Sequence, residues 1–135
     1  MVGIIHNQVL LIGFQSNISI PQYFRKLFGT AEEIRARLDA DHGRIQRAGI
    51  TPIEFQLNPL EQEKGLKDLE GLLRERDYDA IGIGAGVRLH PEYTSLFETI
   101  VNMCRTIAPS APLLFNDGPG GSTATIERVF GMHIP

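Results

Sequence analysis

The sequence predicts a three-layer α/β domain over residues 1–135, with a four-stranded parallel sheet between two layers of helices. Three observations lead to this fold class. Short apolar segments alternate four times with helical segments, the connections between them are mostly short, and no repeat or linker interrupts the order. With 42% hydrophobic and 21% charged residues, the composition is that of one globular domain.

Four segments have the composition of strands, namely residues 8–14, 50–57, 80–87 and 112–116. The first is continuously apolar, which is typical of a strand buried on both faces of a parallel sheet. The second alternates apolar and polar residues and contains Pro52, which has no backbone donor and therefore favours an edge strand. The third is rich in glycine and alanine, which indicates a central strand crowded by helices.

Helical segments separate these strands. Thr30 and Glu33 have the spacing of a capping box and open a helix that ends at Gly49. A second helix is predicted over about residues 60–76. Pro91 is well placed at the start of a third helix, which has Cys104 on its apolar face, and a last helix begins near Ser122.

The edge character of the second strand and the central character of the third predict the strand order 2-1-3-4. In this order and in size, the whole chain resembles the flavodoxin-like architecture, which hosts many functions. The phosphate loop of a flavodoxin is only faintly matched by residues 15–19, so the cofactor stays unassigned. The aspartates of a response-regulator receiver are missing from the ends of strands one and three.

Motifs for nucleotide binding are also missing. Residues 82–86 are glycine-rich, but Val87 breaks the G-x-G-x-x-G pattern, and no G-x-x-x-x-G-K-[ST] segment is present. The four histidines are scattered, so we expect no metal site. Among them, His42 is expected to be a partly buried structural residue.

Charge and hydropathy exclude further classes. A net charge of −3 and a pI near 5.8 argue against a nucleic-acid-binding protein. No segment has the roughly 18–20 consecutive apolar residues of a membrane span, and the first residues lack the pattern of a signal peptide. A single cysteine excludes an internal disulfide. We therefore expect a cytoplasmic protein that binds neither nucleic acid nor membranes.

Parallel sheets bind ligands beyond the carboxyl ends of their strands, where the strand order changes direction. That crevice is expected between strands one and three. The residues predicted to line it are Gln15 and Ser16 after strand one, Arg88 and His90 after strand three, and Asn116, Asp117, Gly120, Gly121, Ser122 and Thr123 after strand four.

Each of these residues has an expected role and a structural alternative. The glycine-rich loop at Gly120 and Gly121, entering a helix at Ser122 and Thr123, exposes backbone N–H groups that suit an anion, and Arg88 adds a charge. The same residues also suit an ordinary strand-to-helix turn. Asp117 or His90 would transfer a proton, while Gln15, Ser16 and Asn116 would line the walls.

One connection is unusually long. Between strand one and Thr30, residues 21–28 form a predicted short helix with three aromatic and two cationic side chains. This segment is a packed cover of the sheet edge, a lid over a pocket, or a contact surface for a second subunit, and the sequence leaves all three open.

Two principal functions follow. The first is the binding of a small anionic or polar metabolite in the crevice, with the question of catalysis left open. The alternative is a non-enzymatic subunit that forms a homodimer or binds another protein through residues 21–28. A third reading, a serine hydrolase using Ser122, is disfavoured because about five residues separate this serine from the strand end.

Overall fold

A single parallel sheet forms the centre of the protein. The computed structural model describes residues 8–15 and 22–135. The strands, in the order β2-β1-β3-β4, are β1 (Gln8–Phe14), β2 (Thr51–Leu57), β3 (Ala80–Ile83) and β4 (Leu113–Phe115). Every neighbouring pair is parallel. The predicted α/β class, strand order and flavodoxin-like arrangement are confirmed.

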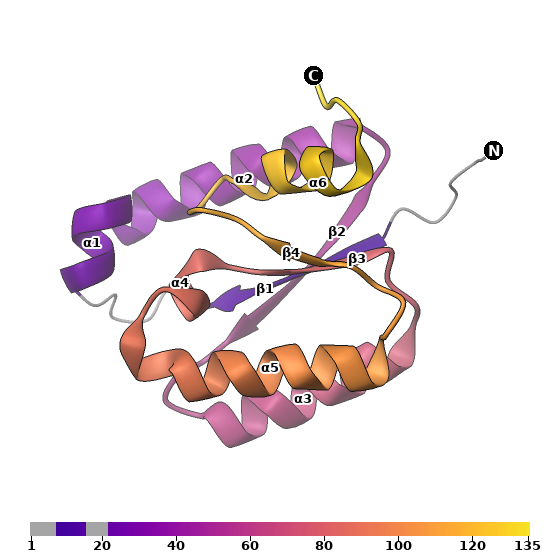
Figure 1. The fold of residues 1–135 in the computed structure, drawn as a ribbon. Coiled ribbons are helices and arrows are strands. Elements are labelled where there is room, and N and C mark those ends of the chain that lie inside the picture. The colour runs from indigo at the N-terminus through magenta and orange to yellow at the C-terminus, as the bar shows by residue number, and fades with distance from the viewer. Residues whose placement is uncertain (1–7, 16–21) are drawn as a thin grey trace.

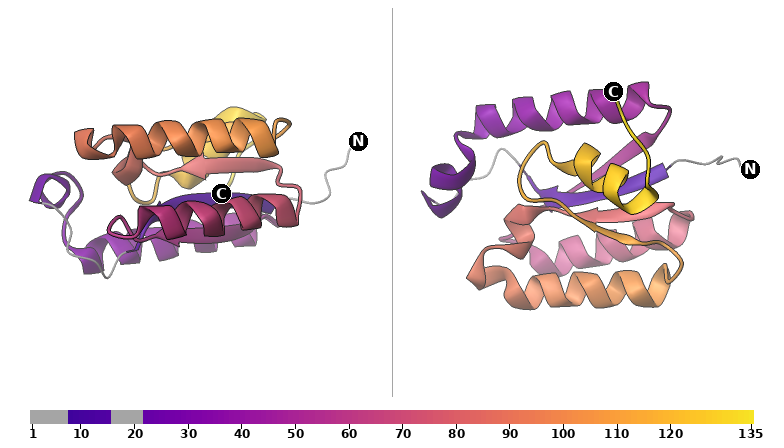
Figure 2. Two further views of the ribbon diagram at one scale, coloured as in Figure 1. Left: turned by 90° about the horizontal axis from the view of Figure 1, so that it is seen from below. Right: turned by 45° about the horizontal axis from the view of Figure 1, so that its top comes forward.

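Helices cover both faces of this sheet (Figures 1 and 2). One layer contains α2 (Ala31–Arg47) and α6 (Ser122–Phe130), and the other contains α3 (Gln62–Glu75) and α5 (Thr94–Ile107). Three short elements gather near the carboxyl ends of the strands: α1 (Gln22–Phe28), α4 (Ala85–Arg88) and the 3₁₀ turn η1 (Pro91–Tyr93). These short elements surround the end of the sheet where a ligand is expected.

Two apolar cores hold the layers together, and the alternating side chains of β1 belong to both. Leu10 and Ile12 pack with buried residues of α3 and α5, among them Cys104. On the opposite face, Leu11 packs with Ile45 of α2 and with residues of α6 and the C-terminus. Burial of β1 on both faces explains why its sequence is continuously apolar.

The predicted ends of the first long helix are confirmed. Thr30 Oγ1 accepts a hydrogen bond from Glu33 N at 3.1 Å, and Glu33 Oε1 accepts one from Thr30 N at 3.2 Å. At the other end, Gly49 has a φ of +87°, a conformation that glycine adopts without steric cost. Pro52 lies on β2, which is an edge strand as predicted.

The predicted third strand, residues 80–87, is too long, because β3 ends at Ile83. Gly84 N still donates to Ile12 O at 2.9 Å, but the next residue turns into α4. Ala85 N donates to the side-chain oxygen of Asn116, the residue that follows β4, at 3.1 Å. Small residues fit a crowded strand and a tight turn equally well, so composition alone could not separate the two.

In the part of the chain that the structure describes, no helix combines the length and the apolar character needed to cross a bilayer.

Candidate functional site

A hollow, here called the main cavity, lies between the sheet and the first half of α2 and reaches the carboxyl ends of β1 and β3. Its volume is about 170 Å³. The residues that line it are Leu11, Ile12, Gly13, Phe14, Gln15, Phe28, Ile34, Leu38, His42, Glu54, Gln56, Pro59, Gly82, Gly84, Ala85, Gly86, Tyr93, Asn116, Gly118, Pro119 and Ser122. It reaches the end of the sheet at which the strand order predicts a crevice.

Glycines create the floor of the main cavity. Gly13 and Gly82 belong to β1 and β3, and the strand register places Gly82 beside Leu11. A Cβ atom added at Gly13 would meet nothing within 4 Å, so the space above it is open. At Gly82 an added Cβ would lie 3.0 Å from the Leu11 side chain. Because these positions have no side chains, the helix above them covers an incompletely filled surface.

The roof is the N-terminal half of α2, which packs less tightly than its C-terminal half. Ile34 and Leu38 line the main cavity and are only half-buried, although they face the sheet. Further along the same helix, Ile45 is fully buried in the core. The helix therefore closes on the sheet at one end and leaves space at the other.

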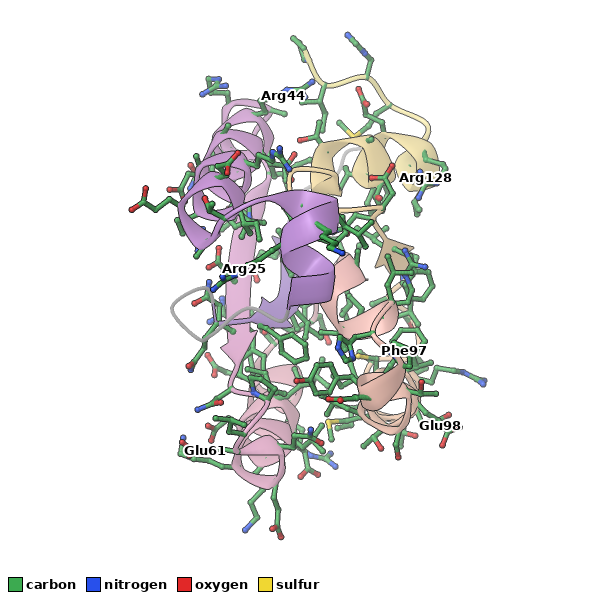
Figure 3. The ribbon with its side chains drawn as sticks, turned by 90° about the vertical axis from the view of Figure 1, so that its left-hand side faces the viewer. Arg25, Arg44, Glu61, Phe97, Glu98 and Arg128 are labelled. Carbon is green, nitrogen blue, oxygen red and sulfur yellow. The ribbon has the colours of Figure 1, made fainter. Side chains whose placement is uncertain are left out.

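Phe28, the last residue of α1, lies over the entrance. An added Cβ at Gly118 would come within 2.9 Å of the Phe28 ring, so the ring rests directly on this glycine. Viewed along the strands from their carboxyl ends, α1 stands in front of the sheet and between the two helical layers (Figure 3). Among the described side chains of α1, that of Phe28 lines the main cavity. The side chains of residues 22–24 are outside the described part, so a role of α1 in a subunit contact stays a prediction.

Three of the polar residues that line this mostly apolar cavity contact one another. His42 Nδ1 lies 3.1 Å from Glu54 Oε2, and Gln56 also donates a hydrogen bond to Glu54. Arg35 donates from both terminal nitrogens to the two carboxylate oxygens of Glu54, at 3.0 and 3.1 Å. This hydrogen bonding to Glu54 raises the pKa of Arg35. Glu54 is thus held as a fixed negative charge at the cavity edge.

A second hollow of about 130 Å³, here called the arginine hollow, lies at the end of β4. Its lining residues are Arg88, Phe115, Asn116, Asp117, Gly121, Ala124, Thr125 and Arg128. Arg88 donates to Asn116 O at 2.7 Å, and Arg128 donates to Phe115 O at 3.1 Å. Among the described residues, neither guanidinium forms an ion pair with a carboxylate. Two cations therefore face one hollow that contains a single acid, Asp117.

The backbone donors at the start of α6 are already occupied by a side chain of the protein. Asp41 of α2 is 3% exposed and accepts hydrogen bonds from Ser122 N at 2.9 Å and Thr123 N at 3.0 Å. The Thr123 hydroxyl donates to the same carboxylate at 2.5 Å. The anion at this helix terminus is therefore an internal carboxylate, and it joins α2 to α6.

The residues singled out from the sequence divide between the two hollows. Gln15, Asn116 and Ser122 line the main cavity, and Arg88, Asn116, Asp117 and Gly121 line the arginine hollow. Asn116 lines both hollows, so it connects them.

Three other predicted site residues lie outside the two linings, and Ser16 lies outside the described residues. Thr123 is 1% exposed beneath Asp41. Gly120 has a φ of +85° and packs against Arg37, which explains the need for glycine there. His90 caps the 3₁₀ turn, because its Nδ1 accepts from Glu92 N at 3.2 Å.

Sequence reasoning missed Asp41, Arg128 and the pairing of His42 with Glu54. Asp41 and Ser122 are 81 positions apart, so no local pattern joins them. Arg128 has the ordinary sequence context of a surface helix. The alternation in β2 placed Glu54 on the polar face, which could have suggested a partner on the helix above it.

Within residues 8–15 and 22–135, no group of three or more His, Cys, Asp or Glu side chains has an arrangement that could hold a metal ion. The chain matches no protein-family model, and a search of curated proteins gives no significant match.

Proposed function

We propose that this protein binds a small metabolite with an apolar body and an anionic or polar group. The body occupies the main cavity, and the anionic group lies toward the arginine hollow, next to Asn116. The observation that carries the proposal is the main cavity itself, a space of about 170 Å³ at the end of the sheet where parallel α/β proteins bind ligands.

The lining of the main cavity supports this ligand class. Aromatic and aliphatic side chains form most of its wall, including Phe14, Phe28 and Tyr93. A few polar side chains, among them Gln15 and Asn116, can fix the orientation of a bound molecule. Mostly apolar walls with few polar groups are typical of small-molecule sites.

The arginine hollow supports the anionic group. The two guanidinium groups of Arg88 and Arg128 have backbone carbonyls as hydrogen-bond acceptors but no carboxylate partner among the described residues. Thr125 adds a hydroxyl group to the same lining. A carboxylate or phosphate would complete the charge balance and accept charge-assisted hydrogen bonds.

Phenyl phosphate is the probe that tests both the apolar site in the main cavity and the anionic site at the arginine hollow, because it joins an aromatic ring to an anion. We expect it to shift the NMR resonances of Phe14 and Tyr93 in the wild-type protein. Arg88→Gln should weaken its affinity by roughly 10- to 100-fold, the equivalent of losing a charge-assisted hydrogen bond worth about 1.5–3 kcal/mol.

Arg105→Gln is the matched control, since Arg105 is an exposed arginine of α5 that lines neither hollow. Urea unfolding of each variant separates a loss of binding from a loss of stability. If phenyl phosphate binds the wild type and Arg88→Gln equally well, the anionic part of the proposal is wrong. If the probe shifts no resonance of the main cavity, the binding function itself is wrong.

A further inference from the structure

The side chain of Glu54 is held in place by several partners. Arg35 binds both of its carboxylate oxygens and also binds Asp39, with Arg35 Nε 3.0 Å from Asp39 Oδ1. Gln56 donates a further hydrogen bond from the same strand. Such a bidentate contact fixes both the position and the plane of the carboxylate. Glu54 therefore presents one oxygen, Oε2, to its neighbour on α2 in a defined direction.

That neighbour is His42, and the contact selects which of its nitrogens carries the proton. An ionised carboxylate favours a proton on the nitrogen that faces it, and this nitrogen is Nδ1, which lies 3.1 Å from Glu54 Oε2. In a neutral imidazole the other nitrogen, Nε2, is then an acceptor with a free lone pair. Among the described residues no hydrogen bond occupies Nε2 of His42. The side chain is 15% exposed and lines the main cavity.

Three ion-paired side chains lie beside His42. Arg35 contributes one positive charge, whereas Asp39 and Glu54 contribute one negative charge each, so this ion-paired group has a formal charge of −1 while His42 is neutral. Protonation of Nε2 brings the total to zero and keeps the contact of Nδ1 with Glu54 Oε2. An imidazole that is oriented and balanced by a carboxylate in this way is a suitable general base.

We propose that His42 is a general base for a molecule bound in the main cavity and that Glu54 is its positioning residue. The Nε2 lone pair takes the proton of an acidic O–H or N–H group of the ligand, and the electron pair of the broken bond stays on that oxygen or nitrogen. In the reverse direction the imidazolium returns the proton. The ligand class is thus narrowed to small molecules with an apolar body and a weakly acidic O–H or N–H group. This inference rests on the proposed binding function.

The chain provides its own control in His133. The Nδ1 atom of His133 lies 3.2 Å from Glu127 Oε2, so the two histidines share the same contact with a glutamate. The side chain of His133 is 85% exposed, however, and lines neither hollow. A glutamate partner is common to both histidines, whereas a position on the main cavity belongs to His42 alone.

The test uses 4-nitrophenol, whose phenol and phenolate forms have different absorption spectra. In the wild-type protein we expect the bound probe to have a phenolate-to-phenol ratio about tenfold above that of the free probe at the same pH, which corresponds to about 1.4 kcal/mol. His42→Gln should bind the probe but lose this enrichment. His133→Gln should behave like the wild type.

Long-range ¹H–¹⁵N NMR spectra test the positioning role separately. In the wild type, His42 is expected to carry its proton on Nδ1, and Glu54→Gln should remove this preference together with most of the phenolate enrichment. A purely structural Glu54 would change stability and leave the tautomer and the bound-probe spectrum unaltered.

The outcomes distinguish the two proposals. Binding of 4-nitrophenol, detected through the resonances of Phe14 and Tyr93, without phenolate enrichment overturns the role of His42 and leaves the binding function standing. Equal enrichment in the wild type and His42→Gln also overturns it, as does a proton found on Nε2. If the probe does not perturb the main cavity at all, both the general base and the binding function are rejected.

Discussion

At the scale of single residues, the most informative side chain is Asp41. It is a buried carboxylate whose oxygens accept hydrogen bonds from two backbone N–H groups and a hydroxyl at the start of α6. The sequence indicated that the glycine-rich loop and the start of α6 would bind an anionic ligand, whereas in the structure Asp41 accepts from the N–H groups of Ser122 and Thr123. It did not indicate that α2 supplies this anion, because only the folded chain brings residue 41 to residue 122.

Replacement of Asp41 by alanine should therefore destabilise the protein. Three hydrogen bonds to a charged group would be lost, and buried donors would be left without acceptors, at a cost of about 3 kcal/mol in the free energy of unfolding. Urea denaturation is the measurement. Asp39→Ala is the control on the same helix, since its side chain is 66% exposed, and it should cost less than about 1 kcal/mol. Equal stability of the two variants would contradict the role given to Asp41.

At the scale of elements, local signals predicted most helices and strands because they depend on neighbouring residues. The capping box at Thr30, the glycine at position 49 and the proline at position 91 all mark element ends in the structure. The end of β3 was predicted wrongly: the chain turns into α4 at Ala85, whose N–H donates to the side chain of Asn116, 31 positions away. Contacts of this kind leave no trace in local composition.

The main cavity also depends on how the secondary-structure elements pack. Gly13→Val tests whether the missing side chain at Gly13 of β1 leaves the space in which a ligand binds. Valine favours strands, and its Cβ would enter open space, so we expect stability within about 1 kcal/mol of the wild type. Its methyl groups would fill the floor of the main cavity and weaken phenyl phosphate binding by at least about tenfold, as shown by calorimetric titration.

Gly71→Ala is the control for this substitution. Gly71 also has open space at its Cβ position, but it lies on the exposed side of α3, away from both hollows. Its replacement should leave binding unchanged and raise the stability of the helix by up to about 1 kcal/mol. Unaltered binding by Gly13→Val would show that the ligand lies elsewhere.

At the scale of the whole molecule, the alternation of strands and helices was enough to predict three layers and the order of the sheet. The connections of a parallel sheet allow few topologies, so a correct assignment of edge and central strands determines the rest. The cavity was predictable only as a position at the end of the sheet. Its volume and polar edge depend on how far α2 stands from β1 and β2, which the residue pattern of α2 does not specify.

Chemical labelling of Cys104 can detect unfolding of the whole molecule, because its side chain is 1% exposed between α5 and the sheet. Burial raises the pKa of its thiol from the ordinary value of 9.0 to about 11. Iodoacetamide should thus label the native protein at least about a thousandfold more slowly than the urea-unfolded chain at pH 8, as measured by mass spectrometry. Rapid labelling without denaturant would contradict the packing of α5.

The raised pKa of the Cys104 thiol also predicts how the free energy of unfolding depends on pH. The folded state binds the thiol proton more tightly than the unfolded state does. Its contribution to stability is therefore complete below pH 9.0 and is lost as the pH rises from there through about 11. Cys104→Ser should remove this alkaline component from the pH dependence of the free energy of unfolding.

The division of α2 into a tightly packed and a loosely packed half has a consequence for how such a chain can diverge. Asp41 and Ile45 in the second half make the contacts that stabilise the fold, whereas Ile34 and Leu38 in the first half face the open space. Mutations in the first half can therefore accumulate and change the shape of the main cavity at little cost in the free energy of unfolding. Under the binding function proposed above, such mutations would change which ligand is bound while the second half of α2 keeps the chain folded.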